Sequence, residues 1–334
     1  MKRGLASVIP QPIAGATSLL TWLLAFPSLS RAQAWVPMKG EGNVTLTYQD
    51  GLQKGHLRSD GERPPTAACC DPVRSHKVNL DIEYGLTDTL ALSLQVPYIT
   101  ARYGGPNPHV IDRYGQPNNA QDDGNYHGAV QDFRFGARWN VTMRPLAITP
   151  FAEAIVASHR YETRAHAAIG PDKRALVLGV NLGRFLDPIL PRAFFQAQVA
   201  YALVQDIVGF RCNRTSVAGE ISYFVTPRLM VRLVESFQVT HDGIYWEDVP
   251  SIAANRDVGL QHDRILRSNF LNLGVAFSFV ISESWDVSAT WGKLVWGESV
   301  TPERRFAASV NWHFRTRRAV PEADPDPGAI PSAF

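Results

Sequence analysis

Apolar and polar residues alternate with a period of two in segment after segment of this 334-residue chain. Within residues 78–84, for example, the apolar side chains hold the even positions, and Asn79, Asp81 and Glu83 hold the odd ones. Successive side chains of a β-strand point to opposite faces, so a strand gathers these polar groups on one side. A helix would place Asp81 within its apolar face. The pattern therefore predicts strands with one polar and one apolar face.

Twelve segments carry this pattern, and most have about the length that a tilted strand needs to cross a bilayer. They are residues 44–48, 78–84, 90–96, 133–139, 148–156, 176–182, 195–203, 217–223, 229–237, 271–279, 285–291 and 306–314. In the ninth segment, Glu235 falls on the face of Leu233 and Phe237, where a charge facing lipid is costly. Either a bulge near Val234 turns Glu235 inward, or the register of this segment differs from the simple alternation.

The connections between these segments alternate between short and long. Short links follow residues 84, 141, 185, 223 and 280, and the long ones span 50–75, 100–127, 158–173, 204–215, 241–268 and 297–304. Short periplasmic turns and long extracellular loops are typical of membrane barrels. Aromatic residues also fall near strand ends, as at the two membrane interfaces of such barrels. We therefore expect an all-β fold, a transmembrane up-and-down antiparallel barrel of about twelve strands.

The first 34 residues have the features of a secretory signal peptide. Lys2 and Arg3 precede an apolar segment at about 13–29, and Ala32-Gln33-Ala34 provides a cleavage site before Trp35. We expect a signal peptide at 1–34, an outer-membrane barrel at 35–315 and a disordered periplasmic tail at 316–334. No other segment approaches 18 uninterrupted apolar residues, which argues against helical spans. The predicted location is the bacterial outer membrane.

The expected partners of the mature chain follow from its charge and its strands. Removing Lys2, Arg3 and Arg31 lowers the basic residues from 33 to 30, against 31 acidic ones. With no basic excess to meet phosphates, nothing indicates a nucleic-acid partner. Outer-membrane lipids are expected partners. So is the outer-membrane assembly machinery, because the last strand resembles the aromatic terminal strand of many outer-membrane proteins, although about twenty residues follow it.

Cysteine and histidine offer two further hypotheses. One hypothesis is a disulfide between Cys212 and either Cys69 or Cys70 in an oxidising compartment, with the remaining cysteine as a free thiol. Eight of nine histidines fall in or beside predicted outer loops, several with acidic neighbours, and imidazole with carboxylate suits divalent metals. His241 and His262 are the candidate metal ligands. The alternative is that these histidines are simply solvated loop residues.

Several short motifs resemble a known group of proteins from residue 84 onwards. They are Tyr84-Gly85-Leu86-Thr87-Asp88, then residues 132–139 (DFRFGARW) and residues 178–183 (LGVNLG). They resemble a broad group of outer-membrane proteins labelled as transporters, which includes the family named for the meta-cleavage pathway of phenol degradation. The resemblance implies a barrel associated with uptake of small, often hydrophobic compounds. It implies no particular functional residues.

Charged residues on the polar faces are the candidate lumen lining. They are Asp81, Glu83, Asp132, Arg134, Arg138, Glu153, Glu220 and Arg232, with Asp286 as a further inward position. Opposite charges across a narrow lumen either screen solutes or pair to fill the interior. We favour a restricted channel for a small solute, with no cofactor and no enzymatic activity. Hydrophobic and aromatic compounds are among the solutes considered. The alternatives are a surface hydrolase with an Asp/His site on its rim, and a structural or adhesive barrel with a filled lumen.

Overall fold

The computed structural model describes residues 33–63, 72–105, 120–163, 165–249, 258 and 261–316. Strands dominate this part of the chain, as the alternation predicts. They are β1 (Glu41–Lys54), β2 (Pro72–Gly85), β3 (Leu90–Tyr103), β4 (His127–Val130), β5 (Phe133–Trp139), β6 (Ala147–Val156), β7 (Ala175–Phe185), β8 (Ala193–Val204), β9 (Arg214–Phe224), β10 (Leu229–Thr240), β11 (Asn269–Ser282), β12 (Trp285–Glu298) and β13 (Glu303–Arg315). The short helices are η3 (Ala120–Asp122), η4 (Trp246–Asp248) and α3 (His262–Ile265).

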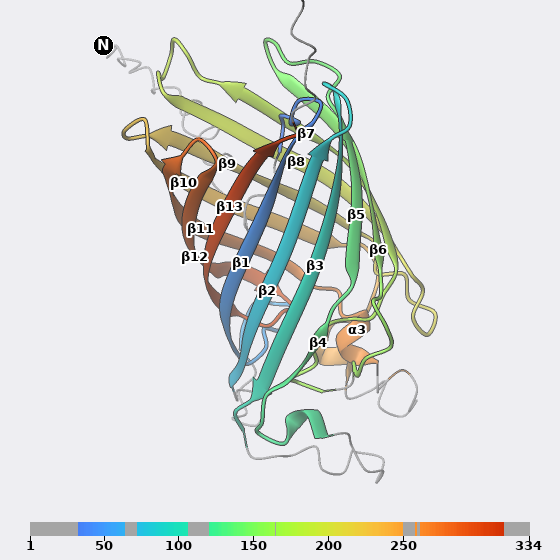
Figure 1. Ribbon diagram of the computed structural model, residues 1–334. Helices are drawn as coiled ribbons and strands as arrows, with labels where there is room; N and C mark the ends of the chain where they lie inside the picture. Colours follow the sequence, from blue (N-terminus) through green and yellow to red (C-terminus); the bar gives the residue numbers. More distant parts are fainter. Residues whose placement is uncertain are drawn as a thin grey trace, which may run out of the picture.

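The strands form one closed antiparallel barrel of twelve strands (Figure 1). Each strand pairs with its neighbours in the chain, and β1 pairs with β13 from Glu41–Arg315 to Gln53–Glu303, which closes the ring. Glu41 also forms an ion pair with Arg315 at this seam. Closure leaves no strand edge unpaired, which a barrel in lipid requires. The predicted fold class is confirmed.

The fourth strand of the barrel is broken into β4 and β5, which both pair with β3. The ladder runs to Gln95–Arg134 and resumes at Tyr98–Val130, so two residues of β3 face three on the broken strand. Pro97, which has no N–H to donate, lies in this gap. Its carbonyl oxygen accepts a hydrogen bond from the backbone N–H of Gln131 at 2.8 Å. The break is a β-bulge that moves Asp132 out of the regular ladder.

The outer surface of the barrel is apolar. Leu46, Leu178, Val275 and Phe277 are among its exposed outward residues. The aromatic side chains that the sequence places near strand ends are also exposed: Tyr48, Tyr98, Trp139, Tyr201, Tyr223, Trp285, Trp291, Trp296 and Trp312. These are the apolar belt and the aromatic girdles of a membrane barrel. In the part of the chain that is described, no helix is long and apolar enough to span a membrane.

The two ends of the barrel differ, as the loop lengths predict. The end that carries the short turns, here the turn end, lies at the top of Figure 1, and β4 and α3 lie towards the opposite, loop end. One predicted long loop, 297–304, is short, because β12 extends to Glu298 and β13 begins at Glu303. The other predicted long links remain between strands. By the usual orientation the turn end is periplasmic and the loop end extracellular.

Glu235 remains on the face of Leu233 and Phe237. Its register with β11 is unbroken, with Glu235 opposite Leu273 on the apolar outer face, so no bulge against β11 turns it inward. Only 6% of Glu235 is exposed, although its neighbour Leu233 is 47% exposed. Its Oε2 atom is buried without a hydrogen-bond partner among the described residues. The structure thus keeps this carboxyl group on the lipid side, tucked against the barrel wall.

Candidate functional site

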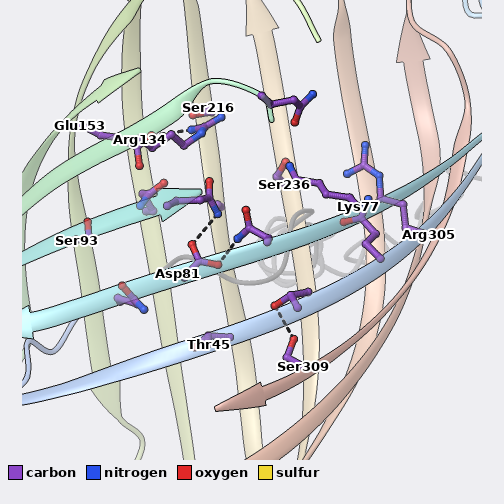
Figure 2. Close-up of a pocket in the computed structure, with 18 of the residues that line it drawn as sticks. Thr45, Lys77, Asp81, Ser93, Arg134, Glu153, Ser216, Ser236, Arg305 and Ser309 are labelled. Carbon is purple, nitrogen blue, oxygen red and sulfur yellow. Dashed lines mark hydrogen bonds and ion pairs between the residues drawn. The ribbon is translucent and has the colours of Figure 1, made fainter. Parts of the chain in front are cut away.

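A cavity of about 970 Å³ occupies the barrel interior. Its walls come from the polar faces of strands all round the barrel, including Thr45 and Thr47 of β1, Asp81 of β2 and Ser309 of β13 (Figure 2). The alternation that makes the outer face apolar places these polar side chains inside. The interior is therefore a polar chamber inside an apolar wall.

Charged side chains along the cavity are mostly paired with one another. Arg134 Nη1 on β5 lies 2.6 Å from Glu153 Oε1 on β6, and Arg232 Nη1 lies 3.2 Å from the buried Glu220. Asp81 accepts a hydrogen bond from Gln95 at 2.6 Å. In Figure 2, Arg134 and Glu153 lie together with Ser216, apart from Asp81. Pairing keeps the interior polar and offsets the cost of removing each charge from water.

Arg138 and Glu83 form the most buried of these pairs. Their side chains are 8% and 7% exposed, and Arg138 Nη2 contacts Glu83 Oε1. Asn43 adds a hydrogen bond to Glu83 Oε2 at 3.0 Å. Arg138 Nη1 also donates to the carbonyl oxygens of Gln33 and Trp35. The pair therefore connects the barrel wall to the chain that precedes β1.

The segment 33–37 enters the turn end of the barrel. Ala34 is fully buried, and its carbonyl oxygen accepts hydrogen bonds from Thr149 Oγ1 at 2.6 Å and Asn140 Nδ2 at 3.2 Å. Its N–H donates to Gln196 Oε1 at 2.7 Å. Trp35 packs against Phe185 and Phe194. The segment narrows the interior at this end, and Gln33 lines the cavity.

Two glycines leave room for this segment. A Cβ atom at Gly183 would overlap Ala34 and contact the Trp35 ring, and one at Gly85 would overlap the carbonyl groups of Pro37 and Met38. Both positions are strand residues whose φ angles are ordinary, so the close approach of another backbone explains them rather than strain. The sequence did not predict residues 33–37 as part of the site. Gly183, a glycine inside a strand, is the sequence feature that could have indicated the close approach of another backbone segment.

At the loop end, the extracellular loops are tied together over the cavity. Glu247 Oε1 accepts hydrogen bonds from the backbone of Ser59 at 2.7 Å and from Arg58 Nε at 3.2 Å. Arg264 donates to the carbonyl groups of Pro171 and Asp172, both at 2.7 Å. These bonds join the loops that precede β2, β7 and β11.

One loop contributes directly to the lining. Residues of the β6–β7 loop, Ile169 and Gly170 among them, lie against the cavity. Asp122 of η3 supports this loop by accepting from the backbone N–H of Ala167 at 2.9 Å. The cavity is thus bounded by loops at one end and by residues 33–37 at the other.

The predicted lining residues divide into three groups. Asp81, Glu83, Arg134, Arg138, Glu153 and Arg232 line the cavity, as does Asp286. Glu220 is buried behind Arg232. Asp132 lies at the bulge, where it accepts a hydrogen bond from Tyr161 at 2.7 Å and holds the β6–β7 loop. The sequence did not single out Lys77, Arg214, Glu303 or Arg305, which also line the cavity.

The two candidate metal ligands lie in different surroundings. His241 Nε2 is 2.7 Å from Thr215 Oγ1, and His262 packs near Trp246 beside Asp263. Among the described residues, no three His, Cys, Asp or Glu side chains converge on one metal position. The structure thus does not join His241 and His262 into a common ligand set. His109 lies outside the described residues.

Two of the loop histidines, His56 and His166, instead belong to an aromatic cluster at the loop end. His56 stacks on Trp246 with ring centroids 3.9 Å apart, and His166 lies 6.2 Å from His56 and stacks on Tyr103. Burial lowers the pKa of His56 to about 4, and the nearby Asp263 carboxylate opposes this effect. His56 is therefore neutral near pH 7.

Cys212 is a buried thiol in an apolar cluster with Ile207, Ile244, Val249 and Ile265. Burial raises the pKa of this thiol. Cys69 and Cys70 lie outside the described residues, so the predicted disulfide stays a prediction. The same holds for the signal peptide, of which residues 1–32 are outside the described part, and for the tail beyond residue 316.

A closed twelve-stranded barrel with an apolar belt and a polar interior defines the class of bacterial outer-membrane β-barrel proteins, and its location is the outer membrane. A solved structure of similar fold is the COG4313 outer membrane channel from Pseudomonas putida F1. The TM-score is 0.61 at 12% identity, and the match covers 86% of this chain and 100% of that one. At this identity the similarity concerns the fold alone.

Two further solved barrels match with lower TM-scores. The KdgM porin in complex with disordered oligogalacturonate matches with a TM-score of 0.42 at 9% identity, over 81% of this chain and 99% of that one. The translocator domain of the autotransporter NalP from Neisseria meningitidis matches with a TM-score of 0.43 at 10% identity, over 83% and 90%. No protein-family model and no curated protein matches the sequence, so the resemblance to the phenol-degradation family stays a prediction.

Proposed function

We propose that this protein is a restricted outer-membrane channel for passive or facilitated passage of a small solute. The observation that carries the proposal is the polar cavity of about 970 Å³, which lies along the inside of the closed barrel. A barrel whose interior were filled by interlocking side chains would leave no such volume. Polar groups on its walls replace part of the hydration shell of a solute as it passes.

The two ends of the cavity determine how restricted the passage is. Residues 33–37 narrow the turn end through hydrogen bonds of Arg138, Asn140 and Thr149 to the carbonyl groups of Gln33 and Ala34. Cleavage of the expected signal peptide before Trp35 removes Gln33 and Ala34. In the mature chain the narrowing therefore rests on residues 35–37, with Arg138 bonded to the Trp35 carbonyl group and the Trp35 ring packed on Phe185 and Phe194. The loops narrow the other end. We expect a small conductance, because the solute passes both constrictions. Uptake of hydrophobic or aromatic compounds, as the sequence resemblance implies, is part of this proposal.

Planar-bilayer recording of the refolded protein tests the channel directly. Discrete, reproducible current steps are expected. Arg134→Glu places two carboxylates where Arg134 now meets Glu153, and it is expected to change the ion selectivity. The control is Arg211→Glu, because the Arg211 side chain is 73% exposed on a loop outside the cavity. A folded protein that gives no steps refutes the channel, and selectivity unmoved by Arg134→Glu refutes this lining.

The hydrolase alternative has less support from the described residues. Asp242 accepts a hydrogen bond from the backbone of Arg211, and His241 faces Thr215. A catalytic pair requires the base to be oriented by a carboxylate and directed at a nucleophile, and adjacent residues such as these point apart. Lipase and peptidase assays on the refolded protein are the direct test of this alternative.

A further inference from the structure

Arg214 differs from most of the arginines of the cavity in having no carboxylate partner. It begins β9 at the loop end and lines the cavity. Arg134, Arg138, Arg232 and Arg305 each form an ion pair with a glutamate. Among the described residues, Arg214 forms no ion pair and its guanidinium makes no hydrogen bond. Arg228, at the turn end, is the other cavity arginine without such a pair.

The electrostatic surroundings of Arg214 do not neutralise it. Arg134 repels it, and Glu153, the carboxylate that attracts it, is already bonded to Arg134 at 2.6 Å. Lys173 of the β6–β7 loop is a second cation that Arg214 repels, and only 9% of Lys173 is exposed. The charge of Arg214 is therefore left without a carboxylate of its own in the cavity wall, and such a cation attracts anions.

The wall beside Arg214 is apolar and built from small side chains. Ala202 of β8 is the cross-strand neighbour of Arg214, and Val177 of β7 is the neighbour of Ala202. Ala200 and Ile155 continue this wall along the cavity. No bulky group separates the guanidinium from these side chains in the ladder. The apolar part of a ligand can thus lie on the wall while its charged end meets Arg214.

A hydroxyl group completes the site. Ser216 follows Arg214 by two residues on the same face of β9, and it lies beside Arg134 and Glu153 in Figure 2. Guanidinium groups bind carboxylates through two parallel hydrogen bonds, and a hydroxyl donates a third. Small inorganic anions are attracted by the charge of Arg214 but make no apolar contact with the wall, so we expect them to bind more weakly than organic carboxylates.

We propose that the loop end of the cavity is a binding site for small organic carboxylates, with Arg214 binding the carboxylate and Ala200, Ala202 and Val177 contacting the apolar body. This rests on the proposed channel function and specifies its substrate class. Because solutes enter from the loop end, the site would concentrate carboxylates at the entrance of the pore.

The test compares benzoate with benzyl alcohol, which has the same ring but no charge. Binding to the folded protein in detergent is measured by titration calorimetry, and block of the chloride current is measured in planar bilayers. The variants are Arg214→Gln and, as a matched control, Arg228→Gln, which removes the same charge from the same cavity at its other end. Migration of unheated protein in gels verifies that each variant is folded.

We expect benzoate to bind and benzyl alcohol to bind much more weakly. Arg214→Gln should weaken benzoate binding and current block by at least about tenfold, because the charge and its two hydrogen bonds to the carboxylate are lost, and Arg228→Gln should leave both nearly unchanged. Equal effects of the two variants, or no preference for benzoate, overturn the proposal while an open channel stands. If no current is seen, the channel fails, and the calorimetric comparison still decides whether Arg214 binds carboxylates.

Discussion

Arg138 on β5 and Glu83 on β2 form a buried ion pair across β3, and the same guanidinium holds the carbonyl groups of Gln33 and Trp35. One side chain thus joins the barrel wall to the segment that narrows the turn end. Stability and conductance are consequently coupled through this residue.

Arg138→Met is expected to release residues 35–37, whose Trp35 carbonyl group Arg138 binds, and to leave Glu83 as an unpaired buried charge. The barrel should lose about 3 kcal/mol of unfolding free energy, and the single-channel conductance should rise. Urea unfolding in lipid vesicles and planar-bilayer recording are the measurements. Arg134→Met is the control, because its pair with Glu153 does not contact residues 33–37. Unchanged conductance in Arg138→Met would show that the segment does not restrict the pore.

Gly183→Val provides a second, independent way to displace the segment. Its side chain would meet the Trp35 ring, and also Ala34 in the chain before signal-peptide cleavage, so the conductance should rise without loss of a charge. Gly136→Ala is the control, since its added methyl group meets mainly the Ser93 hydroxyl, which can rotate away. If the two glycine variants conduct alike, the Trp35 ring does not narrow the turn end in the membrane-inserted protein.

The closed arrangement of the loops should weaken in acid. The pKa of His56 is about 4 in the closed loops, below its ordinary value of 6.5, because burial disfavours the charged ring. An open arrangement exposes the ring and binds the proton more readily. The closed form therefore loses stability as pH falls from about 6.5 to 4, by on the order of 3 kcal/mol in total.

Hydrogen exchange of the loops at pH 7 and pH 5 measures this effect. Exchange, corrected for the intrinsic effect of pH, should be faster at pH 5 in the wild type. His56→Phe keeps an aromatic ring against Trp246 but cannot be protonated, so its corrected exchange should depend less on pH. Equal pH dependence of the two proteins would show that His56 does not cause the effect.

Glu235→Leu should stabilise the barrel. Glu235 occupies an outer-face position of β10 opposite Leu273, and its buried Oε2 is unpartnered among the described residues, so an apolar leucine there would remove an unsatisfied polar group. We expect a gain of about 1–2 kcal/mol in urea unfolding from vesicles. Glu283→Gln, in the turn between β11 and β12, should have little effect. A loss of stability in Glu235→Leu would indicate that the carboxyl group has a partner in the membrane.

The alternation of side chains determined most of the fold. A period of two assigns each residue to the inside or outside of a strand without knowledge of its neighbours, which is why Asp81, Arg134 and Arg232 were predicted to line the cavity. The alternating short and long connections predicted that the barrel has one end of short turns and one end of long loops. Where the local pattern fails, as at Asp132, the cause is a bulge set by pairing with Pro97 on another strand.

Only the tertiary structure decided which charges are paired and what narrows the cavity. Arg134 and Glu153 are 19 residues apart and Arg138 and Gln33 are 105 apart, and no local pattern links them. Register between strands brings such residues together, so sequence alone distinguished neither the paired Arg134 from the unpaired Arg214 nor the fully buried Ala34 from an ordinary residue before a strand. The sequence determines which side of the wall a residue faces, and long-range packing determines what it meets there.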